Sequence, residues 1–371
     1  MKKILLGTTA IIALSTFSAE AFAAEKIKLG LGGFMRHYVG ISNHDEVAVT
    51  ALAGTTRALK LQQNSNTEVY FRGSTTLDNG LSVSVDIQRE SDKSTAGRND
   101  VSALTVSSDT MGALTIGSAG HAGDDMIVRV PNAGNFDWGD TDTYGAIATT
   151  TGANSAAFAM ASASDITDMG GKDGKLKYIS PSFSGVTVYA SYSAGEGSGA
   201  SNLTSGSVNR NTAIDGSTFG VAYSGEVGGA AVSADVTQFR SNGVKNTNHF
   251  GLNVGMAGVT IGGGYSAMND DSGVQSATVA SLDGKAWELG VAFETGPYTM
   301  SAGYMKAESK GTTTAGNHED TKWNLAATYD MGAGVALTAD YFRSKSDAEG
   351  TAVAATDGTV SGVIAGIEVG F

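Results

Sequence analysis

Apolar and polar residues alternate strictly near the end of the chain. Apolar side chains occupy every second position from 363 to 371, and Glu368 and Gly370 separate the last three of them. A period of two is typical of a β-strand with one apolar face. An apolar strand needs a partner to cover its edge, so the pattern predicts that the last strand pairs with the first in a closed membrane barrel.

The same alternation recurs along the chain in segments of roughly ten residues, long enough to cross a bilayer as tilted strands. Clear examples are 81–88, 186–191 and 335–342, although Phe342 falls on the otherwise polar face of the last one. Seven tight turns rich in Gly, Pro, Asn or Asp follow such segments, at 78–80, 109–112, 181–185, 226–229, 257–258, 295–297 and 331–334.

Eight longer polar stretches alternate with these turns, at 41–65, 91–100, 119–173, 195–216, 241–247, 269–284, 308–320 and 346–359. Fifteen connections join sixteen strands. The sequence therefore predicts an all-β fold, a sixteen-stranded antiparallel transmembrane β-barrel with short periplasmic turns and long outer loops. A soluble β-sandwich would also show alternation, but not this asymmetry between short and long connections.

The beginning of the chain is typical of a secretory signal peptide. Lys2 and Lys3 precede a short apolar run, and the small residues Ala21 and Ala23 form a cleavage pattern. We expect residues 1–23 to be a signal peptide and 24–371 to be the barrel. A membrane anchor is the alternative, but the apolar run is short and no basic stop-transfer segment follows. No later run of 18 apolar residues occurs, so we expect no transmembrane helix.

Composition narrows the possible functions further. The chain has no cysteine, so backbone pairing and burial must hold the exported protein together. Its formal net charge of −13 argues against nucleic-acid binding and favours nearby cations. The five histidines are scattered, and no nucleophile motif surrounds any serine. We therefore expect no enzyme, no metal centre and no cofactor, although calcium bound by loop acids at 165–168 or 269–271 stays open.

The longest polar stretch, 119–173, contains the acids that we expect to matter most. Apolar anchors accompany its first part, which favours a loop that packs inward over one that extends freely into water. We expect three of its carboxylates to line a pore constriction, namely Asp124, Asp125 and Asp137. The alternative is that these acids face the water outside.

Basic residues on early strands provide the opposite charge. By parity, Arg36 and Arg72 face the lumen, because a charge on the lipid face costs about 2–4 kcal/mol at the midplane. The expected constriction therefore has arginines on one wall and acids on the loop. Acids outnumber bases, so we expect mild cation selectivity.

Four segments carry a family resemblance: 66–90, 112–117, 177–194 and 360–371. The most specific is Lys177–Val186, which contains a Tyr-x-Ser-Pro-x-Phe-x-Gly hairpin. The chain resembles the general diffusion porins of Gram-negative bacteria, particularly the alphaproteobacterial type. The resemblance implies an outer-membrane homotrimer among lipid and lipopolysaccharide, with the third outer loop, here 119–173, folded inward. It also implies passive diffusion of small hydrophilic solutes, and a terminal Phe371 that the barrel-assembly machinery recognises.

Three other functions are compatible with a barrel. A substrate-specific channel would show an aromatic track in the lumen, and none is visible by parity. An outer-membrane enzyme would need a histidine paired with a serine or aspartate near one rim. A structural or adhesive surface barrel would have a plugged lumen, which a solute-uptake assay would reveal.

Overall fold

The computed structural model describes residues 26–44, 61–92, 99–134, 170–196, 214–272, 283–310, 317–348 and 358–371. The expected signal peptide lies outside these residues, as do Asp137 and the acidic segment 165–168. Within the described ranges, no helix is both long enough and apolar enough to cross a bilayer.

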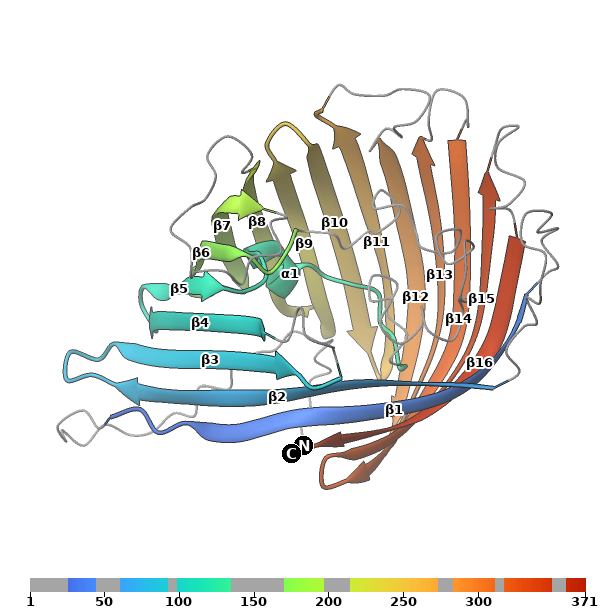
Figure 1. Ribbon diagram of the computed structural model, residues 1–371, viewed down its shortest axis with the longest axis horizontal. Coiled ribbons are helices and arrows are strands. Elements are labelled where there is room, and N and C mark those ends of the chain that lie inside the picture. Colours follow the sequence, from blue (N-terminus) through green and yellow to red (C-terminus); the bar gives the residue numbers. More distant parts are fainter. Residues whose placement is uncertain are drawn as a thin grey trace.

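Sixteen antiparallel strands form one closed barrel, as predicted (Figure 1). The strands are β1 (Gly30–His44), β2 (Gln62–Thr76), β3 (Ser82–Glu90), β4 (Asn99–Ser108), β5 (Gly112–Ser118), β6 (Gly174–Ile179), β7 (Val186–Glu196), β8 (Ile214–Val227), β9 (Ala230–Ser241), β10 (Lys245–Met256), β11 (Val259–Asp270), β12 (Gly284–Thr295), β13 (Tyr298–Lys310), β14 (Asn317–Gly332), β15 (Val335–Ala348) and β16 (Gly358–Gly370). Among the residues described between β5 and β6, one short helix is present, α1 (Ala122–Met126).

The first and last strands close the barrel. Residues 34–44 of β1 pair with 360–370 of β16 in an antiparallel register. The seam ends where the Gly33 amide donates to the Phe371 carbonyl at 2.9 Å and the Phe371 amide donates to the Gly33 carbonyl at 3.1 Å. This pairing confirms the closure predicted from the apolar last strand, and it leaves neither strand with an open edge.

The connections follow the predicted asymmetry with one exception. All seven tight turns are present, and in one of them Ala257 and Gly258 both have positive φ, 54° and 84°, as a two-residue hairpin requires. The predicted long loop 241–247 is wrong, because β9 ends at Ser241 and β10 begins at Lys245. These strands continue beyond the apolar belt, where both faces carry polar residues that the sequence pattern assigned to a loop.

Alternation separates the two faces of the wall. Leu31, Val39 and Ile41 on β1 point outward and are at least half exposed, whereas Tyr38 between them points inward and is buried. Phe342, which broke the pattern, also points inward and is fully buried. Its ring lies so close to Gly362 on β16 that a Cβ there would lie 2.8 Å from the ring. A glycine on the neighbouring strand therefore accommodates the inward aromatic side chain.

Candidate functional site

The chain enters the barrel directly after β5, where α1 begins. The helix start is stabilised by Asp124, whose carboxylate accepts a hydrogen bond from the His121 amide at 2.7 Å. The helix ends after one turn, with the Ile127 amide donating to the Gly123 carbonyl at 2.9 Å. Its buried face includes Ala122, which contacts the wall strands. This short helix redirects the chain into the lumen.

Side chains of β7 and β9 fix the start of this segment. The Ser191 hydroxyl accepts a hydrogen bond from the Ala122 amide at 3.0 Å and lies 2.8 Å from His121 Nδ1. The buried His121 ring meets Phe239 edge-on, with centroids 5.2 Å apart. These contacts satisfy polar groups that burial would otherwise leave unpaired.

Two lysines of β6 approach the same helix. Lys177 forms an ion pair with Asp125, and the Lys175 ammonium donates to the Ala119 carbonyl at 2.6 Å. Both lysines are nearly buried. The predicted constriction acid Asp125 is therefore locally neutralised by a cation that the sequence analysis did not single out.

After α1, residues 127–134 run across the inner wall as an extended segment. Strands far apart in the sequence bind its backbone one after another. These contacts join Val128 N to Asp235 Oδ1 on β9 at 2.8 Å, Arg129 O to Asn253 Nδ2 on β10 at 2.8 Å, Val130 N to Glu288 Oε1 on β12 at 3.1 Å, and Ala133 N to Ser301 Oγ on β13 at 2.8 Å. The Thr328 hydroxyl of β14 also donates to the Ala133 carbonyl. We call residues 119–134 the lumen loop.

Glycines in the wall make room for the lumen loop. A Cβ on Gly251 would lie 2.1 Å from the Val128 carbonyl oxygen. A Cβ on Gly262 would lie 2.9 Å from Pro131, and one on Gly290 would lie 3.1 Å from Val130. These glycines on β10, β11 and β12 therefore let the backbone of the loop approach the wall.

The predicted arginines lie on β1 and β2 and face the lumen, each with a carboxylate partner. Arg36 Nε lies 3.0 Å from Glu368 Oε2 on β16, and Arg72 Nε lies 3.0 Å from Asp86 Oδ1 on β3. Asp124 and Asp125 lie on α1, which contacts β6 to β9. No ion pair among the described residues joins the arginines to the loop acids.

Electrostatics distinguish the two loop acids. Burial raises the pKa of the Asp124 carboxyl to about 7, and the neighbouring Asp125 carboxylate adds to the rise. Asp124 lies on the lumen loop and not on a spanning strand. The charge of the Asp124 carboxyl therefore changes around neutral pH.

Sequence reasoning missed the wall residues that hold the loop, including Asp235 and Glu288. Both occupy inward positions by parity, so their direction was predictable. Their partners Val128 and Val130 are far away in the sequence, because the residue numbers of the two bonded pairs differ by 107 and 158. The inward direction of Lys177 could have been predicted, because Lys177 lies between the apolar Leu176 and Tyr178 on a short strand.

One carboxylate cluster has the spacing of a cation site. Among the described residues, Glu68, Glu90 and Asp100 offer oxygens within 4.8 Å of one another, and Lys172 forms an ion pair with Asp100. The segment 269–271, for which calcium binding was left open, is not part of this cluster. In that segment the Asp270 carboxylate accepts the Ser272 amide at 2.8 Å.

Comparisons with known proteins agree with this architecture. A family model described as Gram-negative porin matches residues 7–349. No curated protein sequence matches the chain. A trimer form of the outer membrane protein OmpT of Vibrio cholerae has 12% identity and a TM-score of 0.63, covering 94% of this chain and 100% of that one.

Two further solved structures have the same fold. A mutant of the porin of Rh. blastica has 14% identity and a TM-score of 0.54. An anion-selective porin from Comamonas acidovorans has 15% identity and a TM-score of 0.55. Each alignment covers 93% of this chain and 100% of the other. Identities this low establish a shared fold and leave each site to be argued from its own residues.

Proposed function

The chain belongs to the Gram-negative porin family, and we propose that its lumen passes small hydrophilic solutes and ions with a mild preference for cations. As a porin it is a channel of the outer membrane and not an enzyme. We infer that the lumen loop narrows the path and that the fixed charges around it set the sign of the ion preference.

The overall balance of charge carries this proposal. Arg36, Arg72 and Lys177 each pair with a carboxylate. Asp124 lies near the charges of Asp125, Arg129 and Lys175. Over the whole chain acids outnumber bases, with a formal net charge of −13, and this excess favours cations in a narrow water-filled path.

The fold alone does not decide the sign of the preference. The Comamonas acidovorans porin is described as anion-selective and has the same architecture. Selectivity must therefore follow from the fixed charges of each lumen. We propose Asp124, Asp125, Arg36 and Arg72 as constriction charges here, with Asp137 as a further candidate outside the described residues.

Reversal potentials in a salt gradient across a planar bilayer test this proposal. The wild type should prefer cations, and an anion preference would contradict the proposal. Asp125→Asn should shift the preference toward anions and Lys177→Met toward cations, each by roughly twofold in permeability ratio, because one fixed charge near the path changes. If both variants shift the permeability ratio equally and in the same direction, Asp125 and Lys177 do not line the constriction.

We also propose that three copies of the chain associate, as OmpT does in its trimer form. The outer surface supports this proposal because it is uneven. Over β12 to β15, aromatic rings pair at two levels of the barrel. Near the outer rim, the ring centroids of Trp287 and Tyr304 lie 5.1 Å apart, as do those of Trp323 and Tyr341. Near the short turns, the ring centroids of Tyr298 and Tyr329 lie 4.9 Å apart. Such belts are typical of lipid-facing walls.

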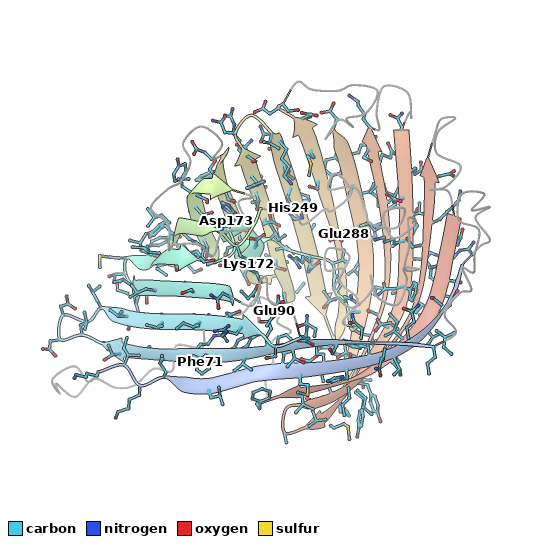
Figure 2. The ribbon with its side chains drawn as sticks, in the orientation of Figure 1. Phe71, Glu90, Lys172, Asp173, His249 and Glu288 are labelled. Carbon is cyan, nitrogen blue, oxygen red and sulfur yellow. The ribbon has the colours of Figure 1, made fainter. Side chains whose placement is uncertain are left out.

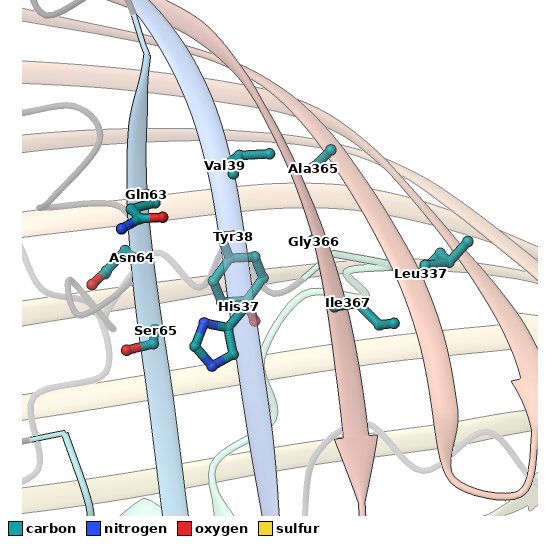
Figure 3. A pocket seen from close by; sticks show the side chains of 10 residues that line it. All are labelled: His37, Tyr38, Val39, Gln63, Asn64, Ser65, Leu337, Ala365, Gly366 and Ile367. Atoms are coloured by element: carbon teal, nitrogen blue, oxygen red, sulfur yellow. The ribbon is translucent and has the colours of Figure 1, made fainter.

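The outward face of β1 to β5 differs. The only tyrosines in these strands, Tyr38 and Tyr70, have inward parity, and the strands contain no tryptophan. A groove on the outside of β16, β1 and β2 is lined by polar His37, Gln63 and Ser65 as well as apolar residues (Figure 3). His37 lies between the exposed Met35 and Val39, within the apolar row of β1. Polar groups at this depth favour a protein partner over lipid.

Cysteine cross-linking tests the trimer, because the chain contains no cysteine of its own. Gln63→Cys should give covalently linked copies with a short bismaleimide in outer-membrane preparations. Leu289→Cys, an exposed position on the aromatic-belted wall, is the matched control and should stay unlinked. Linking at position 289 and not at 63 would place the contact elsewhere.

We further propose that residues 1–23 are removed during export and that the chain is of the alphaproteobacterial porin type. The basic start, the short apolar run and the small residues before position 24 support the first proposal. The hairpin at 177–186 supports the second. N-terminal sequencing of the outer-membrane form should begin at Ala24.

A further inference from the structure

A buried hydrogen-bond network lies directly beneath the lumen loop. It joins Tyr189 on β7, Asp235 and Thr237 on β9, and His249 on β10, each no more than 2% exposed. Figure 2 labels His249 on the strand wall. The network ends at the loop itself, where the Val128 amide donates to Asp235 Oδ1 at 2.8 Å.

The direction of each hydrogen bond follows from Asp235. An ionised carboxylate can only accept, so every group around it must donate. The Thr237 hydroxyl donates to Asp235 Oδ2 at 2.6 Å, and His249 Nδ1, 3.0 Å from the same oxygen, carries a hydrogen toward it. Because the Thr237 hydrogen is engaged, the Tyr189 hydroxyl must donate to the Thr237 oxygen.

Asp235 is thus the common acceptor of three donors from the wall and the loop. Within the described part of the chain, the other ring nitrogen of His249 has no hydrogen-bond partner. His249 therefore contributes its Nδ1 hydrogen bond to Asp235 and no second one. Thr237 and His249 fix the rotamer of the carboxylate, which leaves Oδ1 directed at the loop.

Geometry restricts how the loop can move at this point. The Val128 carbonyl lies against Gly251, where a Cβ would be only 2.1 Å away, so the wall blocks outward movement. Movement into the lumen requires breaking the bond to Asp235. This bond is charge-assisted, and such bonds are about twice as strong as neutral ones.

We propose that Asp235 is the positioning residue that holds the lumen loop against the wall, and that Thr237, His249 and Tyr189 hold Asp235 in place. This inference rests on the lumen loop narrowing the pore, as proposed above. Loss of the acceptor would let residues 127 and 128 leave the wall and enter the water path, which interrupts the current even while Asn253 and Glu288 still bind residues 129 and 130. The wall strands would keep their backbone pairing.

Single-channel recording of Asp235→Asn tests this role. The amide keeps the size of the side chain but cannot accept from all three donors. We expect closures or reduced-current states roughly tenfold more frequent than in the wild type, the size expected when one hydrogen bond to a charged group is lost. The temperature at which the barrel unfolds in detergent should change little.

Asp340→Asn is the matched control. Asp340 is also a buried wall carboxylate, on β15 beside Gly134 of the loop, but its Oδ1 has no hydrogen-bond partner among the described residues. The control makes the same carboxylate-to-amide change without removing a hydrogen bond to the loop. Equal closure frequencies in the two variants would overturn the proposal, since lost charge would then explain both.

Val128→Pro tests the same bond from the loop and leaves the wall intact. Ile127 has φ −64° and ψ 143°, a conformation that a following proline accepts. The variant should reproduce the closures of Asp235→Asn, and the double variant should add no more, because both remove one bond. Additive effects, or a quiet channel in Val128→Pro, would overturn the proposal. An anion preference in the wild type would contradict only the proposed selectivity and leave this comparison valid.

Discussion

Two parts of the barrel wall use the same alternation differently. In the loop-bearing wall, β7 to β15, inward glycines make room for the lumen loop and buried polar side chains bind it. On the outer face of this wall, aromatic pairs form two belts. In the seam wall, β16 with β1 to β5, inward arginines pair with carboxylates and outward polar residues line a groove. The alternation along a strand decides which way a side chain points, whereas the size and polarity of that side chain decide what can pack against it.

The largest expected effect concerns the seam wall. Deleting Phe371 removes both hydrogen bonds to Gly33 and the outward ring at the seam. We expect most of the chain to fail to form heat-resistant barrels, because the terminal contacts that hold the last strand against the first are lost, although residues 34–44 and 360–370 could still pair. Barrels that do form should conduct normally.

Phe183→Ala is the control for this deletion. Phe183 is an exposed aromatic in a short turn, at 65% exposure against 57% for Phe371, but it lies outside the seam. Gel mobility of unheated samples measures the folded fraction. Equal losses in both variants would mean that any exposed rim aromatic serves assembly equally.

An intermediate effect is expected in the loop-bearing wall. Gly251→Ala places a Cβ against the Val128 carbonyl, and overpacking of this kind costs about 1–3 kcal/mol. The loop should lose its docked position while the barrel persists, so single-channel conductance should change. Gly30→Ala, whose Cβ would meet its nearest atom at 3.6 Å, should leave conductance unaltered. A similar change in both would show that the close approach at Gly251 is not decisive.

The smallest expected effect is a pH dependence of selectivity. Because the pKa of Asp124 is raised to about 7, its carboxyl is largely neutral at pH 5.5 and ionised at pH 8.5. Cation preference should therefore rise by roughly 1.5-fold between these values, and Asp124→Asn should abolish the rise. Reversal potentials at the two pH values measure it. A rise that persists in Asp124→Asn would assign the titration to another group.

Protonation of Asp124 also makes the stability of the folded protein depend on pH. The folded state binds the Asp124 proton more tightly than the unfolded chain does. The resulting stabilisation is complete below the unfolded pKa near 3.8 and is lost as the pH rises through about 7.

Much of the fold could be predicted because a period of two is a local property. The strand number, the seam and the inward direction of Arg36 and Arg72 all follow from parity and turn residues. The loop 241–247 was predicted wrongly because strands that extend above the membrane lose the apolar face on which the prediction depended.

The site was less accessible to sequence reasoning. The sequence singled out Asp124 and Asp125, but it predicted neither the helix α1 that carries them nor their partners. Lys177 and Asp235 contact the lumen loop across 52 and 107 residues of chain. Parity places such residues inside, yet it does not give the height at which a loop meets the wall. Their functional roles therefore stay proposals that the experiments above address.

The seam has a consequence for the order of events during assembly. Arg36 and Glu368 meet across it although 332 residues separate them. The first strand cannot find its partner until nearly the whole chain has crossed the inner membrane. Bringing such distant segments together is slow, because the entropy of closing the loop must be lost before the contacts form. Throughout that delay β1 can pair with β2 but its other edge is free, and a free strand edge can pair with other chains, so fast delivery of β16 protects the chain from aggregation.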